Sequence, residues 1–272
     1  MNIEKQTYSR IKSRITGAGP SLVLLPGLGL NLHIFDDLVA ILEKQYQCVC
    51  LDLSGDVPIS ETNTCSIRSI ALEIHTWLHQ NKIVPECVIG HSLGGFIAME
   101  LALAAPDIVP SLVLISSTSR GDDSLLELFI PPRPLSARKM LTRNMELSVY
   151  KPFRRTPAFK QAVANQAQYP GNGKCFMTLL RAATTFNIGN ALRDIECPTL
   201  ILCGRQDAIV SPTQANSLLG AIPRNMMICL EKVGHLPQLE APEQTAVGIQ
   251  SFLRRSRKKL TTMPIIPATW QN

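Results

Sequence analysis

Short apolar runs alternate with longer amphipathic stretches along most of the chain. Runs dominated by apolar side chains predict buried strands at residues 22–25, 48–53, 87–90, 112–116, 199–203 and 226–230. A weaker alternation predicts an edge strand at residues 10–16, and helical spacing predicts helices at residues 34–44, 67–78, 96–105, 215–219 and 243–254. Strands that alternate with helices favour an α/β fold, with a mostly parallel sheet that helices cover on both faces.

The helix predicted at residues 67–78 has the clearest spacing. Apolar side chains recur on one helical face, at Ile67, Ile70, Ala71, Ile74 and Leu78. Ser66 precedes this stretch and can accept a hydrogen bond from the first turn, so it is the expected N-cap. The helix at residues 96–105 is apolar nearly all round, which predicts that it is buried.

The periodicity changes between residues 119 and 190, where no convincing strand is found. Prolines are close together at Pro131, Pro132 and Pro134, and Ala-, Leu- and Arg-rich stretches with a helical pattern follow. A length of 272 residues fits one large domain with an insertion better than two independent domains. We therefore expect a core made by residues 1–118 and 191–258, a helical cap inserted at residues 119–190, and a disordered tail at residues 259–272.

The first residues, the apolar runs and the cysteines together indicate the cellular location. The first residues do not form a positive region followed by an apolar stretch, and no apolar run approaches the roughly 20 residues that span a bilayer. None of the eight cysteines forms a C-x-x-C pair or lies at metal-ligand spacing with histidine. Five cysteines lie in strand-like runs and are expected to be buried free thiols: Cys48, Cys50, Cys87, Cys203 and Cys229. These features favour a cytoplasmic protein without a membrane partner.

The segment Gly90-His91-Ser92-Leu93-Gly94 carries the first chemical signal. An apolar strand runs directly into this Gly-x-Ser-x-Gly pattern and a helix of small residues follows, which is the context of a nucleophile elbow. Glycine is expected at both ends because the tight turn brings backbones together. Ser92 is the predicted nucleophile, and His91 is expected to pack beneath the turn. The Leu93 N–H, at the helix N-terminus, could stabilise a developing oxyanion.

A serine nucleophile needs a base and an acid that orients the base. In a parallel sheet both should follow the carboxyl ends of later strands. Asp207 follows the strand at residues 199–203, and His235 follows the strand at residues 226–230. The chain order Ser92, Asp207, His235 is therefore the one expected for a Ser-His-Asp triad on this type of sheet.

With these residues the chain resembles the α/β-hydrolase superfamily over nearly all of residues 10–255. The most specific segments are residues 90–95, 197–207 and 234–243. The resemblance implies Ser92 as nucleophile, His235 as base and Asp207 as orienting acid. It also implies a cap inserted after the sixth strand, which matches residues 119–190, and a reaction that needs no metal and no organic cofactor.

The resemblance also implies a second oxyanion donor in the loop after the third strand of the family. The loop here is Leu25-Pro26-Gly27-Leu28-Gly29, in which Pro26 replaces the usual histidine. The backbone N–H of Leu28 is then the expected second donor, beside that of Leu93, although Pro26-Gly27 could equally be a plain turn. The segment after Asp52 departs from the family pattern, which leaves the shape of one loop beside the pocket open.

The expected reaction is acyl transfer from a small-molecule ester or thioester to water, because a serine nucleophile excludes the aspartate-dependent branches of the superfamily. A C–C bond hydrolase or perhydrolase with the same triad remains an alternative. The formal net charge is +6, and residues 119–190 hold eleven Lys and Arg against four Asp and Glu. This basic insertion is either a solvated helical face or a docking surface for an acidic acyl carrier protein or a CoA thioester. The solvated face is the simpler interpretation, and a similarity to the pimeloyl-carrier-protein methyl ester esterases of biotin synthesis is the ground for the docking alternative.

A second basic segment lies at residues 254–259. It contains Arg254, Arg255, Arg257, Lys258 and Lys259. No aromatic platform and no binding motif accompanies these charges, so we expect no nucleic-acid partner.

Overall fold

The computed structural model describes residues 11–53, 65–168 and 173–258, and in them a single sheet of seven strands runs in the order β1-β3-β2-β4-β5-β6-β7. The strands are β1 (Lys12–Thr16), β2 (Ser21–Leu25), β3 (Gln47–Asp52), β4 (Pro85–His91), β5 (Leu112–Ile115), β6 (Thr199–Gly204) and β7 (Asn225–Leu230). β1 is antiparallel to β3 at one edge, and the other neighbouring pairs are parallel. The predicted mostly parallel sheet and its edge strand are confirmed.

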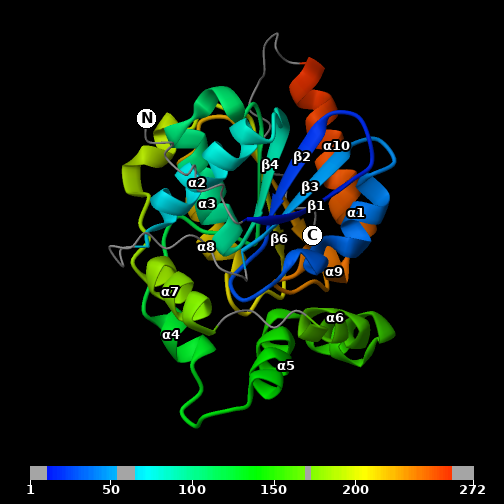
Figure 1. The fold of residues 1–272 in the computed structure, drawn as a ribbon, viewed down its shortest axis with the longest axis vertical. Coiled ribbons are helices and arrows are strands. Elements are labelled where there is room, and N and C mark those ends of the chain that lie inside the picture. Colours follow the sequence, from blue (N-terminus) through cyan, green and yellow to red (C-terminus); the bar gives the residue numbers. More distant parts are fainter. Residues whose placement is uncertain (1–10, 54–64, 169–172, 259–272) are drawn as a thin grey trace, which may run out of the picture.

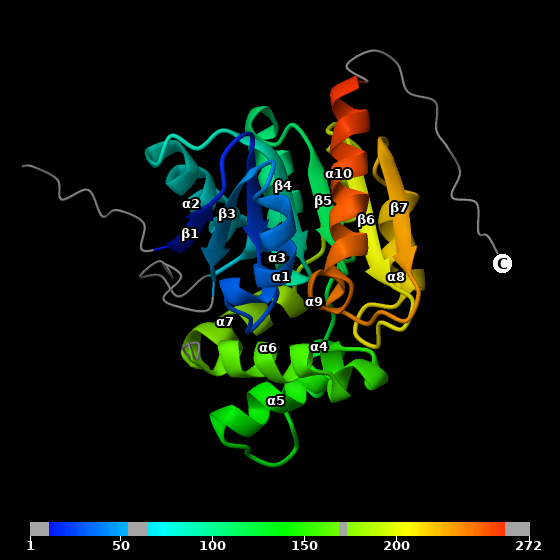
Figure 2. The ribbon, with the colours of Figure 1, turned by 90° about the vertical axis from the view of Figure 1, so that its right-hand side faces the viewer.

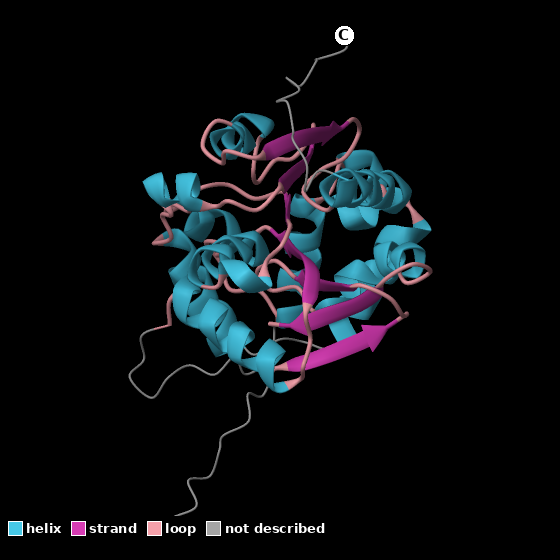
Figure 3. Cartoon of the chain, turned by 90° about the horizontal axis from the view of Figure 1, so that it is seen from above, coloured by secondary structure: helices cyan, strands magenta, loops and turns pink. Residues whose placement is uncertain are grey.

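Helices cover both faces of the sheet (Figures 1 and 3). One face carries α1 (Asp36–Leu42) and α10 (Pro242–Lys258), and the other carries α2 (Ile67–Gln80), α3 (Leu93–Ala104) and α8 (Pro212–Leu219). Alternate strand residues face the two layers: Leu22 and Leu24 pack into the α1 layer, whereas Val23 and Leu25 pack into the α2 layer. The central strands β2 to β6 are therefore apolar on both sides, because a parallel sheet between helices has no solvated face, whereas the edge strand β1 is largely exposed.

The predicted helix starts are accurate where a cap is encoded. Ser66 accepts a hydrogen bond from Ser69 N, and the Ser69 hydroxyl returns one to Ser66 N, so a capping box begins α2. The helix predicted at residues 34–44 is instead divided into a 3-10 helix η1 (Leu32–Phe35) and α1. Asn31 causes the early start, because its side chain accepts a hydrogen bond from His33 N and caps η1.

The segment between β5 and β6 is helical and lies against the carboxyl ends of the strands (Figure 2). It contains α4 (Ser124–Phe129), α5 (Ala137–Ser148), η3 (Lys151–Arg155), α6 (Pro157–Gln168) and α7 (Gly173–Thr184). Its described residues form no strand, although an isolated bridge pairs Arg120 with Asn187 and closes its base. The segment follows β5, the fifth strand in the described part of the chain. We call residues 119–190 the insertion.

The sequence also predicts buried free thiols in the strands and a disordered tail. All eight cysteines are free; Cys48, Cys50, Cys87 and Cys203 are buried in strands, as predicted, whereas Cys229 is only partly buried because β7 is an edge strand. No helix in the described part of the chain is long and apolar enough to cross a bilayer. The predicted disordered tail at residues 259–272 and most of the loop after Asp52 lie outside the described residues.

Candidate active site

Ser92 occupies a strained turn between β4 and α3. Its φ of 51° and ψ of −116° are unusual for a residue with a side chain. A Cβ on Gly90 would lie 2.3 Å from the Gly94 carbonyl oxygen, and one on Gly94 would lie 2.2 Å from the Leu25 carbonyl oxygen. Both distances are far below contact distance, so only glycine fits at either position. The sequence prediction of a tight elbow is confirmed.

Neighbouring backbone and side chains hold this turn. Ser92 N donates to the Ile115 carbonyl at 2.8 Å, and the Ser117 hydroxyl donates to the Ser92 carbonyl at 3.1 Å. A Cβ on Gly95 would lie 2.4 Å from the Ser117 hydroxyl oxygen, so the helix start and Ser117 are in direct contact. Sequence reasoning missed Ser117, because a serine after a strand has no distinctive pattern.

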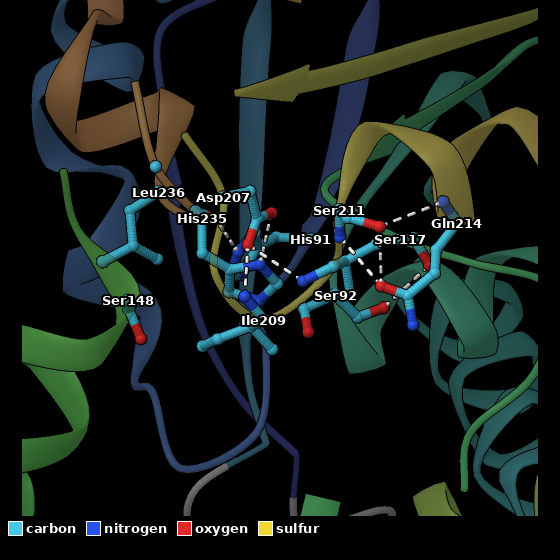
Figure 4. Close-up of polar contacts among 12 residues, drawn as sticks. His91, Ser92, Ser117, Ser148, Asp207, Ile209, Ser211, Gln214, His235 and Leu236 are labelled. Carbon is cyan, nitrogen blue, oxygen red and sulfur yellow. Dashed lines mark hydrogen bonds and ion pairs between the residues drawn. The ribbon is translucent and has the colours of Figure 1, made fainter. Parts of the chain in front are cut away.

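Asp207 and His235 form a buried pair at the ends of β6 and β7. His235 Nδ1 is 2.8 Å from Asp207 Oδ2, and the exposed fractions of the two side chains are 4% and 0%. Asp207 Oδ1 accepts hydrogen bonds from Ile209 N at 2.8 Å and Val210 N at 2.9 Å, which fix the carboxylate (Figure 4). With Nδ1 bonded to the carboxylate, Nε2 of His235 is the nitrogen that can accept a proton.

His91 connects the elbow to this pair. His91 Nε2 donates to the His235 carbonyl at 2.8 Å, and the two rings pack edge to face with centroids 5.0 Å apart. Burial, together with the neighbouring His235 ring, lowers the pKa of His91 well below its ordinary value. A neutral ring with its proton on Nε2 fits this contact, and it fits the expectation that His91 packs beneath the turn rather than acting as the base.

The structure brings Ser92 and His235 to the same sheet edge without joining them. The hydrogen bonds among the described residues include none between the Ser92 hydroxyl and the His235 ring. Hydrogen bonds between a nucleophile and its base are often long in the absence of substrate and tighten in the substrate complex.

The loop predicted to hold the second oxyanion donor lies against the elbow. We call residues 25–31 the oxyanion loop. A Cβ on Gly27 would lie 3.2 Å from the Ser92 Cβ and 2.7 Å from His91 Nδ1. The N–H of Leu28 follows directly, and the N–H of Leu93 is the first in α3, where no intrahelical acceptor exists. Both predicted donors therefore belong to segments that border Ser92.

Two residues that sequence reasoning missed connect these loops to their surroundings. Gln166 of α6 accepts a hydrogen bond from Asn31 N at 2.9 Å, which joins the insertion to the oxyanion loop. Glu240, in the short helix α9 (Pro237–Glu240), accepts backbone hydrogen bonds on both sides of His235. Gln166 has no sequence signal, because its partner is the backbone N–H of a residue 135 positions away. Glu240 lies in the family-like segment 234–243, but that segment does not show which N–H groups it binds. In the described part of the chain, no three His, Cys, Asp or Glu side chains cluster as a metal site would require.

The buried neutral state of His91 predicts a pH-dependent stability. Below about pH 6.5 the unfolded chain takes up a proton that the folded chain refuses, so the free energy of unfolding falls with falling pH, by up to about 1.4 kcal/mol per pH unit for one group. Urea unfolding across pH 5 to 7 should show this slope, and His91→Gln should reduce it. An equal slope in both proteins would mean that folded His91 is charged.

Comparison with known proteins assigns the family. The sequence matches the α/β hydrolase family over residues 22–247. It is 29% identical to a Pseudomonas savastanoi pv. phaseolicola protein named as a candidate carbamate hydrolase, over 82% of this chain and 89% of that relative. It is also 29% identical to the pimeloyl-acyl-carrier-protein methyl ester esterase of Nitrosomonas europaea, over 84% and 94%. The enol-lactonase of Burkholderia xenovorans LB400 has the same fold, with a TM-score of 0.79 at 18% identity over 90% and 96% of the two chains. The chain belongs to the α/β hydrolase family.

Proposed function

We propose that the protein is a serine hydrolase that cleaves carboxylic esters or thioesters through an acyl-enzyme. The proposal rests on one observation. His235 and Asp207 form a buried pair, hydrogen-bonded at 2.8 Å, and the His235 carbonyl accepts from His91, the residue just before Ser92 in the strained turn. Such a pair is costly to bury, and it is useful where a hydroxyl must lose its proton. The esterase names among the relatives support the same reaction class.

In the proposed mechanism Ser92 Oγ attacks the substrate carbonyl while His235 Nε2 takes the hydroxyl proton. Asp207 holds the imidazole in the required tautomer and stabilises its charged form. The N–H groups of Leu28 and Leu93 stabilise the oxyanion. The imidazolium then protonates the leaving alcohol or thiol. Water activated by the same imidazole finally releases the acid.

The insertion is proposed to act as a cap over this site. Its helices lie at the carboxyl ends of the strands, where Ser92, Asp207 and His235 are found. Cap side chains on helix α7 reach the oxyanion loop, since a Cβ on Gly29 would lie 2.9 Å from the Phe176 ring. Aromatic residues of the insertion are therefore available to line an acyl pocket, while others, such as Phe129, are buried in its own packing.

Pre-steady-state kinetics with p-nitrophenyl esters of graded acyl length test the proposal. An acyl-enzyme predicts a rapid burst of nitrophenol, followed by slower turnover, for acyl chains that fit the pocket. The chain length with the highest kcat/KM gives the pocket depth. If the protein cleaves vinylogous diketones and turns over esters negligibly, the C–C bond hydrolase is favoured instead.

A carrier-protein-bound ester is a more specific candidate substrate, favoured by exposed arginines on the insertion. Arg133, Arg138 and Arg155 are exposed, whereas Arg143 is partly buried and donates to the Leu128 carbonyl at 2.8 Å. Exposed guanidinium groups attract acidic proteins and raise association rates. A relative named for an acyl-carrier-protein substrate aligns with 84% of this chain over 94% of its own length.

Charge reversal tests this docking surface. We expect Arg138→Glu with Arg155→Glu to lower kcat/KM for a carrier-protein-bound methyl ester about tenfold or more, while the free methyl ester is hydrolysed as before. Arg224→Glu is the matched control. Arg224 is exposed and precedes β7, so it lies at the amino ends of the parallel strands, whereas the insertion lies at their carboxyl ends. Docking is contradicted if wild type hydrolyses the carrier-bound ester no faster than the free ester.

A further inference from the structure

The backbone around the proposed base is held from outside its own loop. We call residues 233–236 the base loop. Its Gly234 N donates to both carboxylate oxygens of Glu240 at 3.0 Å, and its Leu236 N donates to Glu240 Oε1 at 3.1 Å. The N–H between them, that of His235, donates to the Ser148 carbonyl at 2.6 Å. Three consecutive N–H groups are therefore fixed, two by the Glu240 carboxylate and one by the Ser148 carbonyl, which belongs to the insertion.

The same carboxylate also binds the insertion. Tyr150 N donates to Glu240 Oε2 at 2.7 Å, just after the end of α5. A Cβ on Gly234 would lie 2.6 Å from Tyr150 N, so the two chain segments are in direct contact. Glu240 thus joins residues 148–150 of the insertion to the base loop, across 90 residues of sequence.

Only an ionised carboxylate satisfies these donors. An ionised carboxylate accepts hydrogen bonds and donates none, whereas a protonated acid or an amide would turn a donor toward an N–H. Burial, with a smaller effect of the Asp207 charge, raises the pKa of Glu240 above its ordinary value, although the three backbone N–H bonds act in the opposite direction. A carboxylate kept at this position despite burial and a second negative charge points to a positional requirement.

We propose that Glu240 is a positioning residue that sets the place of His235 and makes it depend on the seating of the insertion. When residues 148–150 are in place, Glu240 and the Ser148 carbonyl together fix the base loop, and the imidazole faces Ser92. When they separate, the base loop loses the Ser148 carbonyl, and Glu240 loses the Tyr150 N–H that holds its Oε2. The inference rests on the proposed function, because it needs His235 to be the base.

Matched amide variants test this role. Glu240→Gln should lower kcat about 10- to 100-fold with little change in KM, because a base displaced by a fraction of an ångström transfers protons poorly. Glu243→Gln makes the same chemical change three residues later, on the exposed first turn of α10, and is the reference for kcat and thermal unfolding. Equal kcat in the two variants overturns the inference.

The pH profile separates positioning from a general loss of structure. Loss of the Glu240 charge beside Asp207 and His235 disfavours the protonated base, so the acid limb of kcat/KM should move to lower pH in Glu240→Gln. Glu240→Asp keeps the charge but is too short for all three donors. It should keep the wild-type limb while kcat stays reduced. A limb that does not move in Glu240→Gln contradicts the proposal.

A main-chain variant tests the link to the insertion, and it remains informative if Glu240→Gln fails to fold. Tyr150 has a φ of −55°, and Val149 before it is extended, so proline fits the backbone angles. Its ring replaces the N–H that Glu240 accepts and pushes the carboxylate away from this position. Tyr150→Pro should lower kcat relative to Tyr150→Ala, which keeps the N–H. Combined with Glu240→Gln, the two losses should be clearly less than additive. Equal kcat in Tyr150→Pro and Tyr150→Ala, or additive losses, overturns the link.

Failure of this inference differs from failure of the proposed function. If wild type shows Ser92-dependent ester hydrolysis and Glu240→Gln behaves as Glu243→Gln does, the function stands and the positioning role falls. If wild type shows no Ser92-dependent turnover, the proposed function itself falls.

Discussion

Replacing Ser92 by alanine is expected to lower kcat/KM for the preferred ester by about 10⁴- to 10⁶-fold, the loss found when a serine nucleophile is removed. The reason is local. In the proposed mechanism Ser92 supplies the oxygen that forms the acyl bond. The turn that presents it would be retained, because alanine adopts the same backbone with the same Cβ. Steady-state kinetics on purified wild type and variant measure this loss.

The thermal unfolding temperature provides the control for Ser92→Ala. The glycines that permit the turn, Gly90 and Gly94, are unchanged in this variant, and so are the hydrogen bonds to the Ser92 backbone. Unfolding temperatures should therefore agree closely. A variant that unfolds like wild type yet retains substantial turnover would show that another residue is the nucleophile.

The second large effect is expected for Asp207→Asn, with a loss of about 10³- to 10⁴-fold in kcat. The amide oxygen can still accept from Ile209 N and Val210 N, which leaves the NH₂ group facing His235 Nδ1. That contact favours the tautomer whose proton is on Nε2, and such a ring cannot take a proton from Ser92. Structure is preserved while the base is disabled.

A comparison across pH checks the mechanism of Asp207→Asn. Turnover should recover partly at high pH, where hydroxide can replace the missing base, whereas binding of a non-hydrolysable substrate analogue should be unaffected. If the variant retains kcat within a few-fold of wild type, the acid has been assigned to the wrong residue.

The sequence predicted the site largely because its parts are encoded locally. The elbow depends on two glycines and a serine within five residues, and the acid and base each follow an apolar run that is readable as a strand. A parallel topology then brings the carboxyl ends of those strands to one edge without further information. Boundaries were less accurate: η1 precedes α1 because Asn31 caps it, and a single capping side chain is easily overlooked within a helical pattern.

What the sequence could not provide is the set of contacts between distant backbone groups. Glu240 lies in the family-like segment 234–243, but nothing in the sequence indicates that Tyr150 N donates to it at 2.7 Å. Nor does the sequence indicate that Gln166 accepts a hydrogen bond from Asn31 N at 2.9 Å. The partners are peptide groups, which every residue carries, so no residue type marks them. The arrangement of α4 to α7 could not be predicted either. These helices pack through contacts between residues distant in the chain, and the sequence pattern of a helix does not show which helix it packs against.

Peptide mapping of fluorophosphonate-treated protein tests the central claim most directly. We expect a single adduct on the tryptic peptide that contains Ser92. It should form in wild type and be lost when the protein is first saturated with a slowly hydrolysed ester. An adduct on any other residue, or active protein that takes up no label at all, would contradict it.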